Sequence, residues 1–224
     1  RLNWHLALGL GQENYRFHDH EKLAHYANAA ADIEFKFPFG FKELEGIHSR
    51  TDFDLGAHEK YSGRKLQYFD PERNETYVPY VVETSIGLDR MFLALFSHCL
   101  KNEVLEDGSE RVVLALPPAL APVKAAILPL VKKDGLPELA EKIFNDLKYD
   151  FNIISEEKDS IGKRYRRQDA IGTPFCITVD HDSLADGTVT LRERDTMKQE
   201  RVKIEDLRKI IDDKVNFRTL LSKI

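Results

Sequence analysis

The stretch Val81-Val82-Glu83-Thr84-Ser85-Ile86-Gly87-Leu88-Asp89-Arg90 joins a strand pattern to a helix pattern and organises the first half of the chain. Its first part is rich in β-branched residues, which favour strands, whereas Leu88 begins a series of apolar residues at helical spacing. That series continues through Met91, Phe92, Leu95, Phe96 and Cys99. The spacing predicts a strand that leads through Gly87 into a buried helix.

This junction gathers three polar side chains, those of Glu83, Ser85 and Arg90. A helix N-terminus carries partial positive charge, so Arg90 in the first turn is unfavourable unless an anion such as phosphate lies nearby. Glu83 and Ser85 are suited to hold a cationic group beside it. The alternative is that Asp89 or another carboxylate pairs with Arg90 and that the junction is purely structural.

Upstream of the junction, the sequence predicts one helix and two hairpins. Apolar residues at helical spacing predict a helix from Asp19 to Ala31, with Asp19 as its cap. Alternation then predicts a hairpin of Ile33 to Phe37 with Phe41 to Ile47. A second hairpin is expected from Lys65–Phe69 and Thr76–Ser85, joined through a cluster of turn formers.

Two acidic residues interrupt the apolar face of the strand Phe41 to Ile47. Strict alternation places Glu43 and Glu45 on one face together with Phe41 and Ile47. Because buried carboxylates are costly unless a cation or hydrogen-bond donors meet them, this face favours a metal, an ammonium group or an arginine. The alternative is an exposed edge strand with solvated glutamates.

The polar stretch Lys101 to Glu110 predicts a linker, so we place the domain boundary there, between residues 1–105 and residues 106–224. Beyond it, strands alternate with helices, which is typical of an α/β sandwich with a mostly parallel sheet. Asp186-Gly187 is expected to turn a final hairpin. The expected strands are Arg111–Leu116, Val123–Leu130, Phe151–Ser155, Pro174–Asp180 and Thr188–Arg194, and the expected helices are Pro137–Leu147, Ser160–Ala170 and Glu205–Asp213.

A local basic patch lies in the second domain. Lys158, Lys163, Arg164, Arg166 and Arg167 are opposed within that segment only by Asp159. Such a patch is suited to RNA phosphates, and the neighbouring residues Tyr165, Arg192, Arg194, Lys198 and Arg201 would add stacking and further phosphate contacts. The alternative is a solvated helix face.

Composition excludes several classes of protein. The 224 residues carry a net charge of -5, so nucleic-acid affinity cannot come from bulk positive charge. Two cysteines cannot form a multi-bridge disulfide framework, which favours a reducing cytoplasm. The longest apolar run, Val112 to Val123, is cut by prolines and is far shorter than the ~20 residues of a membrane span. Because the first residue is Arg1 rather than Met, we expect a piece of a longer protein.

Several other site types lack their full patterns. His18, His20 and His25 have no cysteine pair or His-Glu-x-x-His motif beside them, which disfavours zinc. The glycines of Gly9-Leu10-Gly11 and Gly162-Lys163 complete neither a dinucleotide fingerprint nor a P-loop. Cys99 fits the core of its helix better than the role of a nucleophile.

The motifs together resemble the class II aminoacyl-tRNA synthetases, and within them the glycyl-tRNA synthetase family. Tyr80 to Arg90 is similar to the third signature motif of the class. The segments Ile33–Gly40, Glu43–Ile47 and Arg50–Leu55 resemble the family's active site, and Arg111–Pro122, Gly162–Asp169, Gly172–Phe175 and Arg192–Met197 resemble its anticodon-binding domain.

The resemblance implies the fold class and the site. It implies an α+β remnant of a class II catalytic domain, an antiparallel sheet with helices, followed by an α/β anticodon-binding domain with a mixed five-stranded sheet. Arg90 would bind the terminal phosphate of ATP, with Glu43 also catalytic and a Mg²⁺ ligand. The other implied contacts are Glu43, Leu44, Gly87, Leu88 and Asp89 for ATP; Glu83, Thr84, Ser85, Ile86 and Gly87 for glycine; and Lys163, Arg164, Arg166 and Arg167 for tRNA.

The implied reaction is that of an aminoacyl-tRNA ligase of protein biosynthesis in the cytoplasm. The glycine carboxylate attacks the α-phosphate of ATP, with Mg²⁺ present, to give glycyl-adenylate and pyrophosphate, and glycine then passes to tRNA(Gly). Positioning and charge stabilisation would supply the catalysis. Exclusion of any side chain would select glycine. The implied full-length protein is a homodimer with no membrane partner.

Two departures from the family pattern lead to two hypotheses. Thr84 stands where the family commonly has proline, and the first and second signature motifs are absent. Arg73-Asn74-Glu75 mimics part of the second motif but follows Glu43 and lies in a turn. We therefore expect the C-terminal portion of a glycyl-tRNA synthetase, inactive alone but able to contact tRNA. The alternative is a non-catalytic, synthetase-like accessory subunit that binds RNA or a polymerase.

Overall fold

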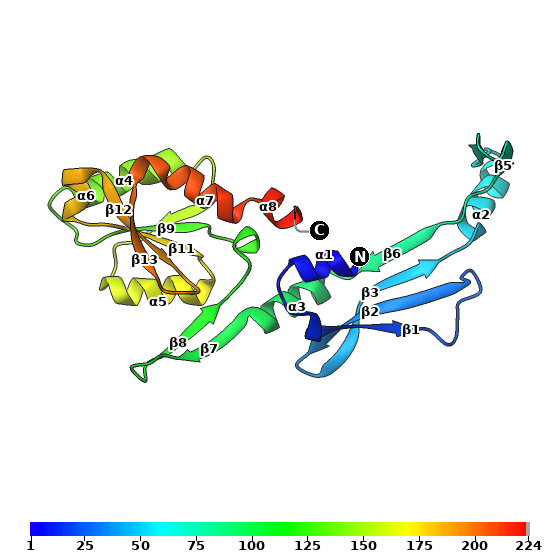
Figure 1. Ribbon diagram of the computed structural model, residues 1–224, viewed down its shortest axis with the longest axis horizontal. Coiled ribbons are helices and arrows are strands. Elements are labelled where there is room, and N and C mark those ends of the chain that lie inside the picture. The colour runs from blue at the N-terminus through cyan, green and yellow to red at the C-terminus, as the bar shows by residue number, and fades with distance from the viewer. Residues whose placement is uncertain (223–224) are drawn as a thin grey trace. The chain divides into compact units, whose positions relative to one another are not determined.

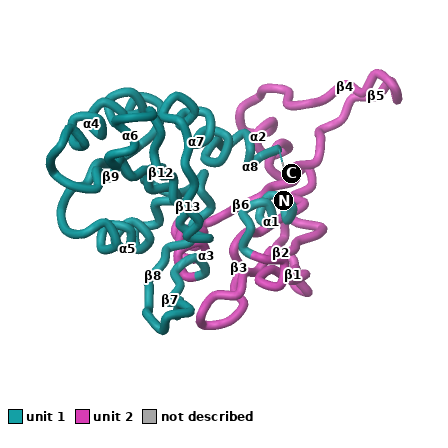
Figure 2. The backbone as a smooth tube through the Cα atoms, turned by 60° about the vertical axis from the view of Figure 1, so that its left-hand side comes forward, with its two compact units in different colours: residues 1–10, 98–224 teal, residues 11–97 magenta. Residues whose placement is uncertain are grey.

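The computed structural model describes residues 1–222 and divides into two compact units. One unit comprises residues 11–97, and the other comprises residues 1–10 together with the chain from residue 98 onward (Figure 2). The boundary between the two compact units therefore lies between Ser97 and His98. The functional boundary between residues 105 and 106 stays a prediction.

The unit of residues 11–97 is built on a four-stranded antiparallel sheet in the order β1-β2-β3-β6 (Figure 1). The strands are β1 (Tyr15–Asp19), β2 (Ala29–Phe37), β3 (Gly40–Ser49) and β6 (Val82–Ile86). Alternation on β2 buries Ile33, Phe35 and Phe37 on one face. The predicted hairpin of β2 with β3 is thereby confirmed.

The predicted helix from Asp19 to Ala31 is wrong. Asp19 ends β1 and pairs with Ala31 of β2, so the ends of the expected helix are two antiparallel strands. The apolar residues at helical spacing lie mostly in the loop between these strands. Pairing across the sheet satisfies the backbone groups that a helix would have satisfied locally, and it overrides the weak helical pattern.

The predicted second hairpin is split in two. Only β4 (Tyr68–Asp70) and β5 (Glu75–Tyr77) pair with each other, and β6 joins the main sheet beside β3. Pro79, which has no backbone N–H to donate, lies in the break between β5 and β6. The sequence patterns also missed the helix α2 (Phe53–Ser62).

The helix after the junction is present as predicted, but most of its surface is not buried. α3 (Leu88–Cys99) buries Met91, Ala94 and Cys99, whereas Leu88 is 82% and Phe92 is 65% exposed. The apolar residues on its other sides exceed what one face of a helix can bury, so the expectation of a buried helix is wrong for this chain.

The second unit contains the mixed five-stranded sheet that the resemblance implied. Its order is β10-β9-β11-β12-β13; the first three strands run parallel and the last two pairings are antiparallel. The strands are β9 (Ala125–Pro129), β10 (Ile153–Ser155), β11 (Phe175–Val179), β12 (Thr188–Glu193) and β13 (Gln199–Lys203).

The membership of this sheet differs from the expectation at one strand. β13 was not predicted, and β8 (Glu110–Leu114), which was expected in the sheet, instead pairs with β7 (Leu100–Val104) as a separate hairpin. The stretch Lys101 to Glu110 is therefore mostly strand and turn rather than a linker.

Helices cover both faces of the five-stranded sheet (Figure 1). α4 (Leu136–Leu147) and α7 (Leu207–Val215) pack on one face, and α5 (Ile161–Ile171) packs on the other, close to the predicted bounds. The expected final pair of antiparallel strands is present as β11 and β12, but the short helix α6 (His181–Asp186), which ends at Gly187 with a left-handed φ of 69°, joins them in place of a tight Asp186-Gly187 turn. Two further short helices are α1 (Leu2–Ala7) and α8 (Phe217–Leu221), and the 3-10 turns are η1 (Gln12–Asn14), η2 (Pro118–Leu120) and η3 (Ile204–Asp206).

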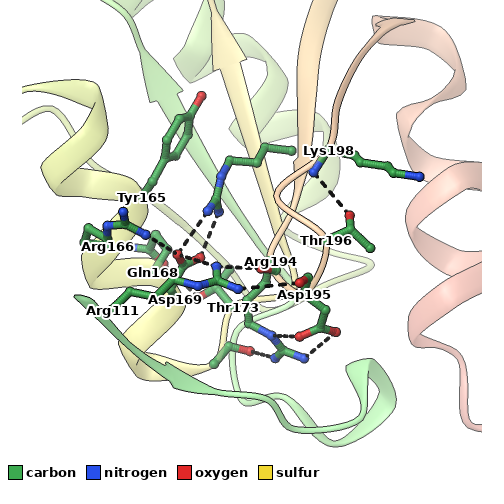
Figure 3. A network of polar contacts seen from close by, with 12 residues as sticks. Arg111, Tyr165, Arg166, Gln168, Asp169, Thr173, Arg194, Asp195, Thr196 and Lys198 are labelled. Carbon is green, nitrogen blue, oxygen red and sulfur yellow. Dashed lines mark hydrogen bonds and ion pairs between the residues drawn. The ribbon is translucent and has the colours of Figure 1, made fainter. Parts of the chain in front are cut away.

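A network of buried charges joins α5 to three other parts of this unit (Figure 3). Asp169 of α5 is fully buried and accepts two hydrogen bonds from Arg192, at 2.8 and 3.0 Å, and one from Arg111, at 3.1 Å. Arg111 also pairs with Glu103 at 2.6 Å and donates to the carbonyl of Arg194 at 2.9 Å. The Asp169 network thus fixes α5 against β12, the β7–β8 hairpin and the chain after β12.

Arg194 extends the Asp169 network to two loops. Its side chain, 1% exposed, donates to the carbonyls of Gly172 and Leu116, each at 2.7 Å, and pairs with Asp195. Gly172 itself has a φ of 86°, and a Cβ there would lie 3.0 Å from the carbonyl oxygen of Leu114. Only glycine fits this position without displacing backbone.

The longest helices among residues 1–222 have 12 residues, and none of the described helices has the length and apolar character needed to cross a membrane.

Replacing Asp169 should strongly destabilise the second unit. In Asp169→Ala the guanidinium groups of Arg111 and Arg192 stay buried without their shared carboxylate, which we expect to lower the free energy of unfolding by about 3–5 kcal/mol. Urea denaturation followed by circular dichroism measures this. Asp213→Ala removes an exposed carboxylate that pairs with Lys209 and is the control, with an unchanged midpoint expected. Equal midpoints for the two variants would contradict the structural role of the network.

Candidate functional site

A bulge in β3 decides which acidic residues face the candidate site. Ile33 pairs with Glu45 and Glu34 pairs with Glu43, so Leu44 has no partner on β2. The extra residue shifts the alternation, and Glu43 and Glu45 lie on opposite faces of the sheet. Glu45 is fully buried on the face of Ile33, whereas Glu43 is on the other face. The expectation that both acids share a face is wrong.

Glu43 and Arg90 come together from segments far apart in the sequence. The Arg90 Nη1 lies 3.4 Å from the Glu43 carboxylate and donates to the Glu43 carbonyl at 2.7 Å. Both side chains are 54% exposed, so each can make further hydrogen bonds on its solvent side. Of the two interpretations of Arg90, the structure contains the carboxylate partner, and this partner is Glu43 rather than Asp89. The pair leaves the outer side of the guanidinium open to an anion.

The residues around Gly87 are accessible. Gly87 accepts the backbone hydrogen bond of Met91 at 2.9 Å, which starts α3, and Leu88 beside it is among the most exposed apolar residues. Leu44 differs, because its side chain is 1% exposed at the bulge. Contact of Leu44 with a bound molecule is therefore limited to its backbone.

β6 presents Glu83 and Ser85 on the same face as Glu43. Residues two apart on a strand share a face, and the partners of Glu83 and Ser85 on β3 are His48 and Gly46. Thr84 and Ile86 face the opposite side, with Ile47 and Glu45. The five residues expected to contact glycine are thus divided between two faces of the sheet.

Gly46, which pairs with Ser85, lies close against two polar side chains. A Cβ at Gly46 would lie 3.0 Å from the His48 ring and 3.5 Å from the carboxylate of Asp32. Any side chain at this position would have to displace the His48 ring. The polar face is therefore shaped around a position without a side chain.

The sequence patterns missed Arg50, which holds Glu83 in place. The Arg50 Nη1 lies 3.0 Å from the Glu83 carboxylate, and the same guanidinium binds Asp54 of α2 and lies 4.0 Å from the centre of the Tyr26 ring. The hydrogen bond with Arg50 lowers the pKa of Asp54, and that bond also raises the pKa of Arg50. Arg50 belongs to the Arg50–Leu55 segment, but nothing in its spacing indicated a pairing with a residue on β6.

On α5 the basic residues divide into buried and exposed members. Arg164 is 2% exposed and donates to the carbonyls of Pro129, Glu156 and Leu130 at 2.7, 3.0 and 3.3 Å. Burial lowers the pKa of its guanidinium. The terminal nitrogens of Arg164 donate inside the fold, which disfavours the predicted contact of Arg164 with tRNA.

Arg167 is also largely neutralised. It binds Glu156 at 2.6 Å and Asp159 at 2.9 Å, and these hydrogen bonds raise its pKa. The other cations of α5 are Lys163, which is exposed, and Arg166, whose side chain is 39% exposed; they lie three residues apart on one side of the helix. Arg166 lies at the edge of the Asp169 network, 4.0 Å from Asp169 (Figure 3).

The residues expected to assist this patch are mostly internal as well. Arg192 and Arg194 are buried in the Asp169 network, and Arg201 pairs with Asp180 at 2.6 Å. The Tyr165 ring lies under Arg192, at 4.8 Å, and its hydroxyl bonds Thr178, so this ring is not free to stack on a base. Lys198 is exposed. Of the cations expected in this patch, those not used inside the fold are therefore Lys158, Lys163, Arg166 and Lys198.

Comparison with known proteins gives matches for both halves of the chain. A family model described as an anticodon binding domain matches residues 124–214, which contain all five strands of the mixed sheet. The RNA binding domain of threonyl-tRNA synthetase from Cryptosporidium parvum Iowa II has a TM-score of 0.65 over 85% of this chain and 44% of that chain. At 20% identity this likeness shows the fold alone.

Similar sequences cover nearly the whole chain. A glycine–tRNA ligase from Chlorobaculum tepidum is 56% identical over 203 residues, which is 90% of this chain and 43% of that protein. Those from Borrelia hermsii and Clostridium perfringens are each 53% identical, over 92% and 96% of this chain and 48% and 47% of their own lengths. The resemblance drawn from the motifs is confirmed: the chain is similar, over at least nine tenths of its length, to slightly less than half of each of these glycine–tRNA ligases.

Proposed function

We propose that this chain is part of a glycine–tRNA ligase, which activates glycine with ATP and transfers it to tRNA(Gly). The observation that carries the proposal is the meeting of Glu43 and Arg90 at 3.4 Å, on the sheet face that also presents Glu83 and Ser85. A cation and carboxylates on one open polar face suit an amino acid and a nucleotide bound side by side. The similarity to glycine–tRNA ligases supports the same function.

Glu83 and Ser85 are the proposed ligands of the glycine ammonium group. A carboxylate and a hydroxyl are acceptors of the right kind, and the bond from Arg50 fixes the Glu83 carboxylate in one orientation. His48 and Asp32 lie close to Gly46, which pairs with Ser85, and we propose that these groups leave no room for a substrate side chain. Steric exclusion of this type selects the smallest amino acid.

Arg90 and Glu43 are the proposed ATP ligands. The outer side of the Arg90 guanidinium is open to a phosphate, and Arg90 would hold that phosphate by charge and hydrogen bonds. Glu43 offers a carboxylate oxygen of the type that Mg²⁺ prefers. An ion of this kind is held by one or two carboxylates together with substrate phosphates. When bound, Mg²⁺ supplies charge neutralisation for the phosphates.

The remaining parts of the proposal follow from the same match. Lys163, Arg166 and Lys198 are the proposed phosphate contacts of tRNA on the anticodon-binding domain. The matched ligases are about twice as long as this chain, so we propose that this chain alone does not aminoacylate and that the full-length protein is a cytoplasmic homodimer. The accessory-subunit alternative is less well supported, because the similar proteins are ligases.

Removing the Arg90 guanidinium should abolish the first half-reaction. In the full-length protein, Arg90→Ala loses the proposed phosphate contact, and we expect glycine-dependent ATP–pyrophosphate exchange to fall by a factor of 10² or more. Arg73→Ala is the matched control, because Arg73 is an exposed arginine of the same unit in the turn between β4 and β5. Exchange at the wild-type rate in Arg90→Ala would overturn the assignment.

Removing the exposed cations of α5 should weaken tRNA binding in a salt-dependent way. For Lys163→Ala with Arg166→Ala, the slope of log affinity against log salt should fall by about 1.5, since each released phosphate contact contributes about 0.7–0.9. Filter binding of tRNA(Gly) at several salt concentrations measures the slope. Lys209→Ala with Lys214→Ala removes the same charge from α7, on the opposite face of the sheet. Equal slopes for the two double variants would indicate that this side of α5 is a solvated helix face that does not bind tRNA phosphates.

A further inference from the structure

The segment Phe53–Tyr80, here called the arm, lies outside the core of its unit. It leaves the main sheet after β3 and returns at β6, and it contains α2 and the β4–β5 hairpin. None of the residues of α2 is buried. Figure 1 shows α2 and β5 beyond the ends of β3 and β6. A segment that adds nothing to the core needs another reason for its apolar residues.

The arm exposes a set of aromatic rings. Tyr68 and Tyr77 lie directly opposite each other on the hairpin, with their ring centres 6.0 Å apart and their planes at 72°. Rings held in this edge-to-face arrangement leave ring faces open to a third group. The exposed rings, with their exposed fractions, are Phe53 43%, Tyr61 83%, Tyr68 52%, Phe69 54%, Tyr77 40% and Tyr80 64%.

Two acids of the arm, Asp70 and Glu59, bind groups within the arm, and one of its cations, Arg73, lies near Asp70 and Glu75. Asp70 accepts hydrogen bonds from the backbone of Glu72 and Arg73, which forms the turn between the strands. Glu59 similarly binds the backbone of Leu66 and the side chain of Gln67.

By contrast, the side chains of Lys60, Arg64 and Lys65 pair with no carboxylate among the described residues. Lys60 lies 5.5 Å from the centre of the Tyr61 ring. These cations stand at the end of α2 and just beyond it, next to the exposed rings in sequence. The arm thus presents three unpaired cations and open aromatic faces together.

We propose that the arm binds single-stranded RNA, with its rings stacking on bases and Lys60, Arg64 and Lys65 contacting phosphates. Open rings beside unpaired cations are the combination that proteins use for single strands, since every base has a face that can stack. An apolar protein partner would not account for three unpaired cations beside the rings.

The arm is connected to the proposed glycine site through Arg50. Its guanidinium binds Asp54 of α2 and Glu83 of β6 at the same time, at 2.5 and 3.0 Å. A strand of RNA on the arm would therefore be held next to the segment that presents Glu83. We assign this RNA as the single-stranded 3′ end of tRNA, a step that rests on the proposed function, whereas the binding of single-stranded RNA does not.

Removing one exposed ring should weaken the binding of single-stranded RNA without affecting folding. Tyr61→Ala in the whole chain should reduce the affinity for a labelled eight-nucleotide RNA ending in CCA by 5-fold or more, measured by fluorescence anisotropy. Tyr149→Ala is the matched control, because Tyr149 is 87% exposed and lies beside Lys148 as Tyr61 lies beside Lys60. This control should bind the RNA with unchanged affinity.

The cations give a second and independent readout. Lys60→Ala with Arg64→Ala and Lys65→Ala should lower the slope of log affinity against log salt for the same RNA by about 2, as three single-strand phosphate contacts require. All three side chains point away from any core, so the variant should unfold at the wild-type temperature. An unchanged slope together with unchanged affinity in Tyr61→Ala would overturn the proposal.

A second RNA separates this proposal from the proposed function. An anticodon stem-loop of tRNA(Gly) should lose affinity in the α5 double variant and keep it in the arm variants. If arm variants change neither RNA but alter self-association in sedimentation, the arm is an interface between copies and the RNA proposal is wrong. If the wild-type chain binds the stem-loop but not the CCA-ended strand, the arm proposal fails and the proposed function stands. If it binds neither, both fail.

Discussion

The carboxylate of Asp169 is the constraint on which the second unit depends. A fully buried carboxylate is unfavourable unless cations meet it, and Arg111 and Arg192 do so. These arginines are in turn buried and need acceptors for their remaining N–H groups, which Glu103 and the Arg194 carbonyl supply to Arg111. One buried acid thereby dictates the position of a hairpin, a helix and the chain after β12. The five-stranded sheet supplies the hydrophobic core. The Asp169 network fixes the positions of the β7–β8 hairpin, α5 and the chain after β12 around that sheet.

The need of buried arginines for internal acceptors also explains why a run of basic residues does not predict which of them can contact RNA. Along α5, Arg164 is directed to backbone carbonyls and Arg167 to carboxylates, although neither contact is visible in the sequence. Arginine is suited to this internal role because its planar group donates several hydrogen bonds at once. Lysine binds as a compact charge, and Lys163 stays exposed. The surface available to phosphates is therefore smaller than the charge run, and its members can be chosen only after the internal acceptors are known.

The sequence predicts the fold where periodicity is long and local. The junction from Val82 through Cys99 and most of the α/β elements are present within a few residues, because regular spacing and buried faces determine them. Prediction fails where a residue that is distant in the sequence determines the local conformation or the pairing. Leu44 forms a bulge that pattern analysis cannot detect, and this one residue separates Glu43 from Glu45. Asp19 pairs with Ala31 rather than capping a helix, and the pairing of Arg50 with Glu83 joins residues that are 33 positions apart in the numbering.

The candidate site combines both kinds of information. The sequence identifies its residue types, since Glu83, Ser85 and Arg90 lie within eight positions. The sequence does not show on which face of the sheet each residue lies. The face shared by Glu43, Glu83 and Ser85 carries these polar groups, whereas Thr84 and Ile86, which are also exposed, lie on the opposite face with Ile47 and Glu45. Arg50 then links this face to the arm. Because the same guanidinium holds Asp54 and Glu83, any movement of α2 changes the support of the carboxylate proposed to bind glycine. RNA on the arm and glycine on the sheet would thus be coupled through one side chain.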